Sequence, residues 1–169
     1  MKTADVIIVG SGASGLFNAL FLPQDYKVIV ITKKEVEESD SFLAQGGISA
    51  LKNPEDYDSY FEDTMKAGHY ENDKGAVEKM IKESPQIIQD LKDFGVRFDL
   101  KDGEIEFTRE GGHSTFRILH HEDLTGKEIT SHLYEEAKKR DNITIMENCM
   151  MIDIIEKDGE CKGIVYKDQ

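Results

Sequence analysis

A glycine-rich segment near the N-terminus has the GxGxxG spacing that suits contact with a phosphate. It follows the apolar, β-branched run at residues 4–9 and precedes an apolar stretch that ends before Pro23. The first glycine permits a tight turn, the second lets backbone amides approach a pyrophosphate, and the third packs a helix against a sheet. The pattern predicts a dinucleotide site, with an ordinary strand-to-helix turn as the alternative. The predicted binding residues are Gly10, Ser11, Gly12, Ala13, Ser14 and Gly15.

An acidic residue that binds the ribose hydroxyls is expected about 20 positions after such a turn. The apolar run at residues 27–32 ends instead in Thr32-Lys33. Either Thr32 or a backbone group holds the ribose, or the adenosine end lies differently. Lys33 meets a phosphate or the adenine edge, or it belongs to a solvated loop end.

The hydrophobic pattern predicts an α/β fold with a parallel sheet. Strands at residues 4–9 and 27–32, both buried on two faces, enclose a helix and form a βαβ unit. Helical spacing recurs at residues 57–68 and 77–94, where Pro85 should kink or break the helix and Gly95 should cap it. Residues 33–51 show no period and predict a long loop.

The remainder of the chain predicts short strands and loops at residues 96–121, with a turn at Asp102-Gly103. A helix should begin at Thr125, and a strand should cover residues 142–146. The last two runs, residues 150–156 and 161–166, flank Asp158-Gly159 and predict a C-terminal β-hairpin.

Composition narrows the classes of function. The 169 residues carry 21 basic and 34 acidic side chains, so the formal net charge is −13. This excess of acid argues against nucleic acid and anionic membranes as partners. No apolar run approaches the roughly 20 residues that span a bilayer. Two cysteines, Cys149 and Cys161, without a CxxC spacing fit a reduced, cytoplasmic protein. We expect no metal site.

A second loop, Ser39-Asp40-Ser41-Phe42-Leu43-Ala44-Gln45-Gly46-Gly47-Ile48, contains a glutamine followed by two glycines. Such a sequence lets the backbone approach a flat ligand closely and present amides to it. Together with the glycine turn, this loop resembles the flavoprotein family of succinate dehydrogenase, fumarate reductase and L-aspartate oxidase. The resemblance extends from Val6 to about Val165 and implies a Rossmann-like FAD-binding domain.

The resemblance implies that the loop runs along FAD and meets its isoalloxazine ring. The implied cofactor contacts are Asp40, Ser41, Phe42, Leu43, Ala44, Gln45, Gly46 and Gly47, together with Met151 and Ile152 beside the adenine. Respiratory members of the family bind FAD covalently through a histidine of this loop. Asp40 occupies that position, so the resemblance implies noncovalent FAD.

A third segment separates the members of the family. Arg109-Glu110-Gly111-Gly112-His113-Ser114, which continues to Gly126, resembles the L-aspartate oxidase branch. L-aspartate is succinate with an added α-ammonium, and a carboxylate can pair with that ammonium. Glu110 is therefore the expected ammonium-binding residue, with a surface glutamate as the alternative. His113 either touches substrate or holds the loop. We interpret His69, His120, His121 and His132 as structural or solvated, and Arg117 as a support for the loop.

The implied reaction is FAD-dependent oxidation of L-aspartate to iminosuccinate, with oxygen or fumarate as acceptor. Its product feeds quinolinate synthesis and thus NAD biosynthesis. The alternatives are a soluble fumarate reductase and a non-catalytic nucleotide-binding remnant. Family members are several hundred residues long, so residues 1–169 correspond to the N-terminal part of the FAD-binding domain. We expect that the capping domain, the C-terminal part and every catalytic residue are absent. We also expect that the isolated chain binds FAD weakly or not at all and does not turn over substrate.

Overall fold

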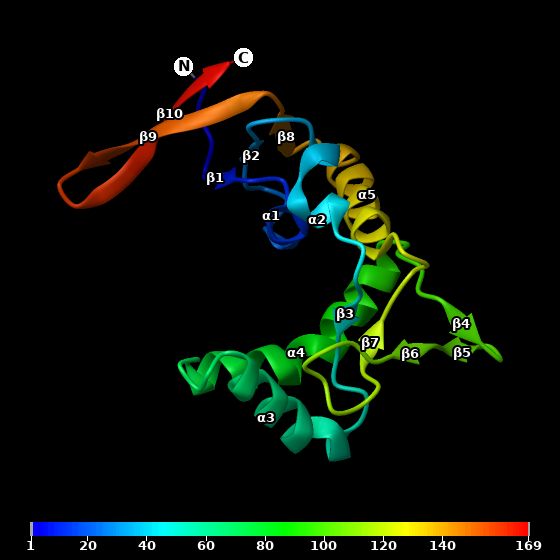
Figure 1. Ribbon diagram of the computed structural model, residues 1–169. Helices are drawn as coiled ribbons and strands as arrows, with labels where there is room; N and C mark the ends of the chain where they lie inside the picture. The colour runs from blue at the N-terminus through cyan, green and yellow to red at the C-terminus, as the bar shows by residue number, and fades with distance from the viewer. Residues whose placement is uncertain (1, 169) are drawn as a thin grey trace. The chain divides into compact units, whose positions relative to one another are not determined.

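A computed structural model describes residues 2–168, which form two compact units (Figure 1). One unit combines the chain up to Ala44 with the chain from Gly126 onward. The other unit contains Gln45–Thr125.

The first unit is built on a three-stranded parallel sheet. Its strands are β1 (Val6–Val9), β2 (Val28–Ile31) and β8 (Ile143–Met146), in the order β1-β2-β8. Helix α1 (Ala13–Phe21) follows the glycine turn and ends before Pro23, as predicted. Ala19 of α1 packs with Val28 and Val30, so the βαβ unit has a common apolar core.

The two strands of the βαβ unit differ in burial. All four residues of β2 are buried, as expected. The prediction that residues 4–9 form a fully buried strand is wrong, because Ile7 is 38% exposed and Val9 is 51% exposed. Burial alternates along the strand, so Ile7 and Val9 share one face that no layer of residues 2–168 covers fully. Its other face, which includes Ile8, packs against the α1 core.

The C-terminal part of the first unit begins with α5 (Thr125–Lys138) and ends with the predicted hairpin. Strands β9 (Cys149–Lys157) and β10 (Glu160–Asp168) pair antiparallel, and Figure 1 shows them as a long ribbon. Asp158 and Gly159 form the turn with φ of +57° and +77°, which confirms the turn predicted from their types. Both cysteines are free thiols.

Residues 33–51 contain regular structure that the prediction of a long loop missed. Within the first unit they form η1 (Val36–Glu38) and α2 (Asp40–Leu43). The α2 helix begins because the Ser39 hydroxyl accepts a hydrogen bond from the Phe42 amide at 3.3 Å. In the second unit β3 (Ile48–Ser49) pairs with β7 (Ile118–Leu119). Helices of one turn and strands of two residues are too short to produce a readable hydrophobic period.

The second unit combines two helices with short strands. Following η2 (Pro54–Asp56), helices α3 (Tyr57–Ala67) and α4 (Lys74–Asp93) pack through Tyr60, Met65, Val77 and Ile81. Four further short strands are β4 (Leu100–Lys101), β5 (Glu104–Ile105), β6 (Phe107–Thr108) and β7, and the antiparallel order β3-β7-β6 forms the larger sheet. The turn between β4 and β5 lies at Asp102 and Gly103, as predicted.

Helix α4 continues through Pro85, so the expected break is absent. Proline removes the N–H that would bond the carbonyl four residues earlier, which belongs to Ile81. The Ser84 hydroxyl donates to that carbonyl at 2.7 Å and replaces the lost bond. The helix ends at Asp93 with Phe94 as its C-cap residue, one position before the predicted Gly95. Gly95 has φ of +91°, and its amide donates to Lys92 O while the Val96 amide donates to Leu91 O. Although α4 has 20 residues, none of the helices in residues 2–168 is apolar enough to cross a membrane.

The α3–α4 core makes a prediction about stability. Ile81 is fully buried, whereas its neighbour Met80 is 47% exposed. We expect Ile81→Ala to lower the free energy of unfolding by about 2–5 kcal/mol, because it leaves a cavity in the core. Met80→Ala, the matched control, should cost much less. Urea unfolding followed by circular dichroism measures both, and equal losses for the two variants would contradict this packing.

Candidate functional site

The glycine turn of the first unit has the geometry that its spacing predicts. Gly10 has φ of +111°, and its amide donates to Ile31 O at 2.8 Å, which ties the turn to β2. A Cβ at Gly15 would lie 2.1 Å from Gly10 O, so a larger residue does not fit there. Gly12 is the N-cap of α1. The helix therefore begins at the turn with its positive end toward any bound phosphate.

A cleft of about 590 Å³, which we call the glycine-turn cleft, opens at this turn. It is lined by residues 9–12, 31–35, 38–41 and 149–151. The structure thus brings together many of the predicted cofactor residues: Gly10, Ser11, Gly12, Thr32, Lys33, Asp40, Ser41 and Met151. Ser14 and Gly15 line a neighbouring cleft beside β1. Ala13, Phe42, Leu43, Ala44 and Ile152 do not line the glycine-turn cleft.

Polar groups of the glycine-turn cleft fit the diphosphate and ribose of a dinucleotide. The Ser11 hydroxyl is buried and has no hydrogen-bond partner within the described residues. A buried hydroxyl without a partner is costly, and a phosphate oxygen at the turn would satisfy it. Lys33 adds a positive charge to the same cleft. Glu35, which lies 20 positions after Gly15 and which sequence reasoning missed, adds a carboxylate of the type that binds ribose hydroxyls.

In the second unit the Gln-Gly-Gly segment and Glu110 lie together. The Gly47 amide donates to Glu110 Oε1 at 3.3 Å. The same carboxylate oxygen would lie 3.5 Å from a Cβ built at Gly46. A Cβ at Gly47 would lie 2.3 Å from both the Ile118 side chain and Leu119 O, so this position requires glycine. Two segments 63 residues apart in sequence are therefore in direct contact.

These residues border a cavity of about 530 Å³, which we call the Glu110 cavity. It is lined by Gln45, Gly46, Gly47, Thr108, Glu110, His120, Glu122 and Asp123. Its charged lining residues Glu110, Glu122 and Asp123 are all acidic. Such a cavity attracts an ammonium group and repels a carboxylate.

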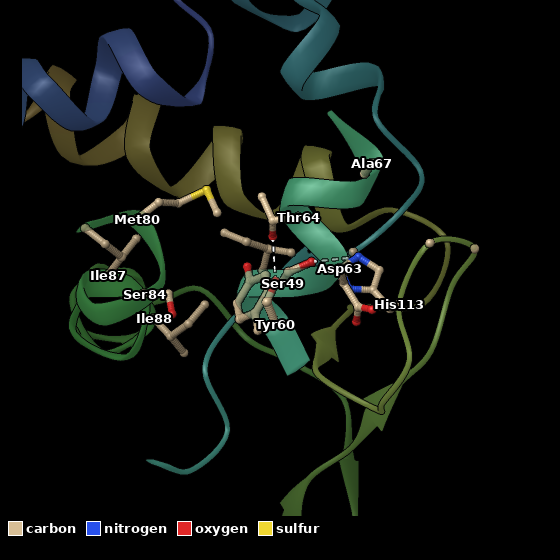
Figure 2. A pocket seen from close by; sticks show the side chains of 14 residues that line it. Ser49, Tyr60, Asp63, Thr64, Ala67, Met80, Ser84, Ile87, Ile88 and His113 are labelled. Carbon is tan, nitrogen blue, oxygen red and sulfur yellow. Dashed lines mark hydrogen bonds between the residues drawn. The ribbon is translucent and has the colours of Figure 1, made fainter. Parts of the chain in front are cut away.

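His113 lines a different cavity, of about 540 Å³, which we call the Tyr60 cavity. Figure 2 shows His113, Ser49 and Tyr60 on one side of it and Met80, Ile87 and Ile88 of α4 on the other. The His113 Nε2 atom lies 3.3 Å from Ser49 Oγ. The structure therefore separates His113 from Glu110, although the backbone amide of His113 donates to Glu110 O at 3.3 Å.

A fully buried arginine supports the loop that carries these residues. Arg117 donates from Nε to Asp56 Oδ2 at 2.9 Å and from Nη2 to Asp56 Oδ1 at 2.8 Å. Its Nη2 also donates to Ser59 Oγ, and its Nη1 donates to Asp63 Oδ2 at 2.6 Å. The guanidinium lies over the Tyr60 ring, 4.8 Å from the centroid. Asp56 thus pairs with the buried cation in a bidentate geometry, and Asp63 adds a further charge-assisted hydrogen bond.

The same network fixes the 110–114 loop. Asp63 Oδ2 accepts hydrogen bonds from the Ser114 amide at 2.7 Å and the Ser114 hydroxyl at 2.8 Å. Arg117 Nη1 lies 3.1 Å from His113 Nδ1, which places a donor against this ring nitrogen. The guanidinium donates, so Nδ1 accepts and the ring proton lies on Nε2, toward Ser49. The expectation that Arg117 supports the loop matches these contacts.

The charged groups of the network have shifted pKa values. The hydrogen bond from Arg117 is the main cause that lowers the pKa of Asp56 to about 2. Burial opposes ionisation of Asp63, but the bonds from Ser114 and Arg117 outweigh it and lower the Asp63 pKa as well. Both groups are therefore carboxylates at neutral pH.

The sequence matches the model of a known protein family. The chain belongs to the FAD binding domain family, whose family model matches residues 5–169. FAD is accordingly its cofactor, and the glycine-turn cleft has the groups to hold the dinucleotide.

Individual relatives show which members of the family the chain is similar to. An L-aspartate oxidase of Clostridium acetobutylicum is 46% identical over 160 residues, which is 94% of this chain and 37% of the relative. An L-aspartate oxidase of Clostridium perfringens is 42% identical over 165 residues, which is 98% of this chain and 38% of the relative. A quinol fumarate reductase of E. coli superposes with a TM-score of 0.90 at 26% identity, over 96% of this chain and 29% of that one. The chain thus spans less than two fifths of the curated relatives it matches.

The Arg117 network makes a prediction about acid stability. The unfolded Asp56 carboxyl titrates near 3.8 and the folded one near 2, so its stabilisation is fully present above about pH 4 and disappears as the pH falls through about 2. Asp56→Asn should lower the free energy of unfolding at neutral pH by at least about 2 kcal/mol. The variant should also lose stability less steeply between about pH 4 and pH 2.

Exposed Asp58, two residues away on α3, provides the matched control. Asp58→Asn should change the free energy of unfolding by less than about 0.5 kcal/mol. Urea midpoints across this pH range test both variants. A wild-type midpoint with the same pH dependence as Asp56→Asn would contradict the proposed origin of the acid sensitivity.

Proposed function

We propose that this chain forms the N-terminal part of the FAD-binding domain of an enzyme that oxidises L-aspartate to iminosuccinate. The observation that carries the proposal is the position of Glu110 on the 45–47 backbone, in a cavity whose lining contains no lysine or arginine. An amino acid has an ammonium for such a cavity, whereas succinate and fumarate do not. The identity of 42–46% to two L-aspartate oxidases supports the same substrate.

Oxidation removes a hydride from Cα of aspartate and a proton from its α-nitrogen, which leaves a C=N double bond. FAD, when bound, supplies the acceptor for the hydride. Glu110 binds the ammonium by charge and hydrogen bonding, and so orients the Cα–N bond. The Gly47 amide fixes the Glu110 carboxylate in turn. The acidic lining offers the substrate carboxylates no positive partner, so groups outside the Glu110 cavity must hold them.

Cofactor binding in the proposal is noncovalent. Asp40 lines the glycine-turn cleft but lacks the nucleophilic nitrogen with which a histidine would bond to the flavin. The buried Ser11 hydroxyl, the Lys33 ammonium and the amino end of α1 would hold the diphosphate. Contact with FAD stays a prediction for five further residues, which are Phe42, Leu43, Ala44, Met151 and Ile152.

Further parts of the proposal follow from the reaction. Oxygen or fumarate would reoxidise the flavin, and the product would pass to quinolinate synthesis in the cytoplasm. Fumarate reduction is the competing activity, because a quinol fumarate reductase shares the fold at 26% identity. The two activities differ in whether the substrate has an ammonium, so Glu110 separates them.

A chimera tests the proposed function. Residues 5–169 of this chain replace the matching part of the Clostridium acetobutylicum relative, which supplies the rest of the enzyme. We expect the purified chimera to bind FAD and to form hydrogen peroxide with L-aspartate in air. A chimera that binds FAD and reduces fumarate with a reduced viologen dye, but does not oxidise L-aspartate, would show that the proposed substrate is wrong.

Within this chimera, the Glu110→Gln variant should lose discrimination for the ammonium. We expect its KM for L-aspartate to rise about 10- to 100-fold, because a charge-assisted bond is lost. Its fumarate reduction should change little. Glu104→Gln, at an exposed position on β5, is the matched control and should behave as the parent. An unchanged KM in Glu110→Gln would rule out the ammonium-binding role.

A further inference from the structure

The Glu110 cavity contains a second group with the capacity to bind a ligand. His120 directly follows β7 and lines the cavity with Glu110, Glu122 and Asp123. Its Nε2 atom is buried and has no hydrogen-bond partner within residues 2–168. Sequence reasoning interpreted this histidine as structural or solvated, because nothing in the local pattern shows that its ring nitrogen lacks a partner.

The His120 ring is held from its other side. Its Nδ1 atom lies 3.1 Å from Asp99 Oδ2. The Asp99 backbone amide also donates to His120 O at 2.8 Å, and Asp99 Oδ2 accepts the Glu122 amide at 2.7 Å. The carboxylate therefore has a fixed position against the ring. A carboxylate at Nδ1 favours the tautomer with its proton on Nδ1, as in histidines oriented for metal binding or catalysis.

In that tautomer Nε2 has a lone pair and accepts a hydrogen bond. A buried acceptor without a partner is unfavourable, so a ligand N–H that reached Nε2 would be stabilised there. The charge of the cavity determines which kind of ligand can donate a hydrogen bond to Nε2. Its three lining carboxylates favour a cation, and residues 2–168 contain no group of three His, Cys, Asp or Glu side chains arranged to hold a metal ion. The ligand is then an organic cation with several N–H bonds.

We propose that His120 Nε2 accepts a hydrogen bond from the primary ammonium of an α-amino acid in the Glu110 cavity, with Asp99 as the positioning residue. This inference rests on the proposed function and adds a second ligand-binding residue to it. The ammonium has three N–H bonds, so it satisfies the Glu110 carboxylate and the His120 nitrogen together. A plain dicarboxylate leaves Nε2 without a partner and meets repulsion from the acidic lining.

Nuclear magnetic resonance of the 169-residue chain tests the inference. Long-range ¹H–¹⁵N correlation spectra of labelled histidine rings are recorded at a pH where the rings are neutral, with His120→Gln used for assignment. We expect His120 to have its proton on Nδ1. Its Nε2 resonance should shift on titration with methylammonium or L-aspartate and stay unchanged with succinate at equal ionic strength. His132, which pairs with Glu128 in the other unit, is the internal control.

Two variants sharpen the test. Glu110→Gln should leave the His120 tautomer intact and weaken methylammonium binding at least about tenfold, because the charge that attracts the cation is lost. Glu104→Gln should leave both unchanged. A proton on His120 Nε2, an Nε2 resonance that neither ammonium probe moves, or an equal shift with succinate would each overturn the inference.

The chimera distinguishes a failure of the proposed reaction from a failure of the proposed role of His120. L-aspartate oxidation by the chimera, together with a His120 resonance that does not respond, would overturn only the role of His120. A responsive His120 in a chain whose FAD-loaded chimera reduces fumarate but does not oxidise L-aspartate would support the ammonium site and overturn the proposed reaction.

Discussion

The buried guanidinium of Arg117 is the constraint on which the second unit depends. A cation buried away from solvent must be paired, and Asp56 at the N-cap of α3 and Asp63 in the middle of this helix pair it. Asp63 then binds the backbone and hydroxyl of Ser114, so the same charge balance that satisfies the arginine fixes the loop. Removing one carboxylate would leave part of a buried charge unpaired. The network therefore ties the helical half of this unit to the segment that carries Glu110.

Two glycines contribute to the fold by allowing close contacts that a side chain would block. Gly47 permits the 45–47 backbone to lie against β7, and this contact brings its amide to Glu110. Gly15 permits α1 to lie against the carbonyl of Gly10. The first contact holds the Gly47 amide against the Glu110 carboxylate, and the second holds the amino end of α1 at the glycine-turn cleft. Such groups have little freedom to reorganise, which is the property that a binding site for a charged ligand requires.

Much of the first unit could be predicted from sequence because its signals are local. The glycine turn, the buried strand β2 and the hairpin turn at Asp158 each depend on residue types within a few positions. The exposure of Ile7 and Val9 could not be predicted, because it depends on whether another layer packs on their face of β1. The continuity of α4 through Pro85 was missed because the compensating hydroxyl of Ser84 is recognised only once its direction is known.

The residues of the candidate site could be predicted in part from the sequence, whereas the contacts between them could not. Glu110 and the Gln-Gly-Gly segment were identified separately by type and resemblance, but their contact spans 63 residues and only the fold shows it. Glu35 has the expected spacing from the glycine turn, but it lies beyond the end of β2, and only the fold shows that it lines the glycine-turn cleft. His120 could not have been singled out, since its significance comes from a ring nitrogen that is buried without a partner.

The place of β1 at the sheet edge has a consequence for how copies of this chain behave in solution. Within residues 2–168 β2 is the strand that pairs with β1, so the other edge of β1 has backbone groups that no strand pairs, beside the exposed side chains of Ile7 and Val9. Such an edge is a template for pairing with another polypeptide. The net charge of −13 opposes this association, because like-charged molecules repel. Salt screens this repulsion beyond about 10 Å at 0.1 M, so a higher ionic strength favours the association of copies through this edge.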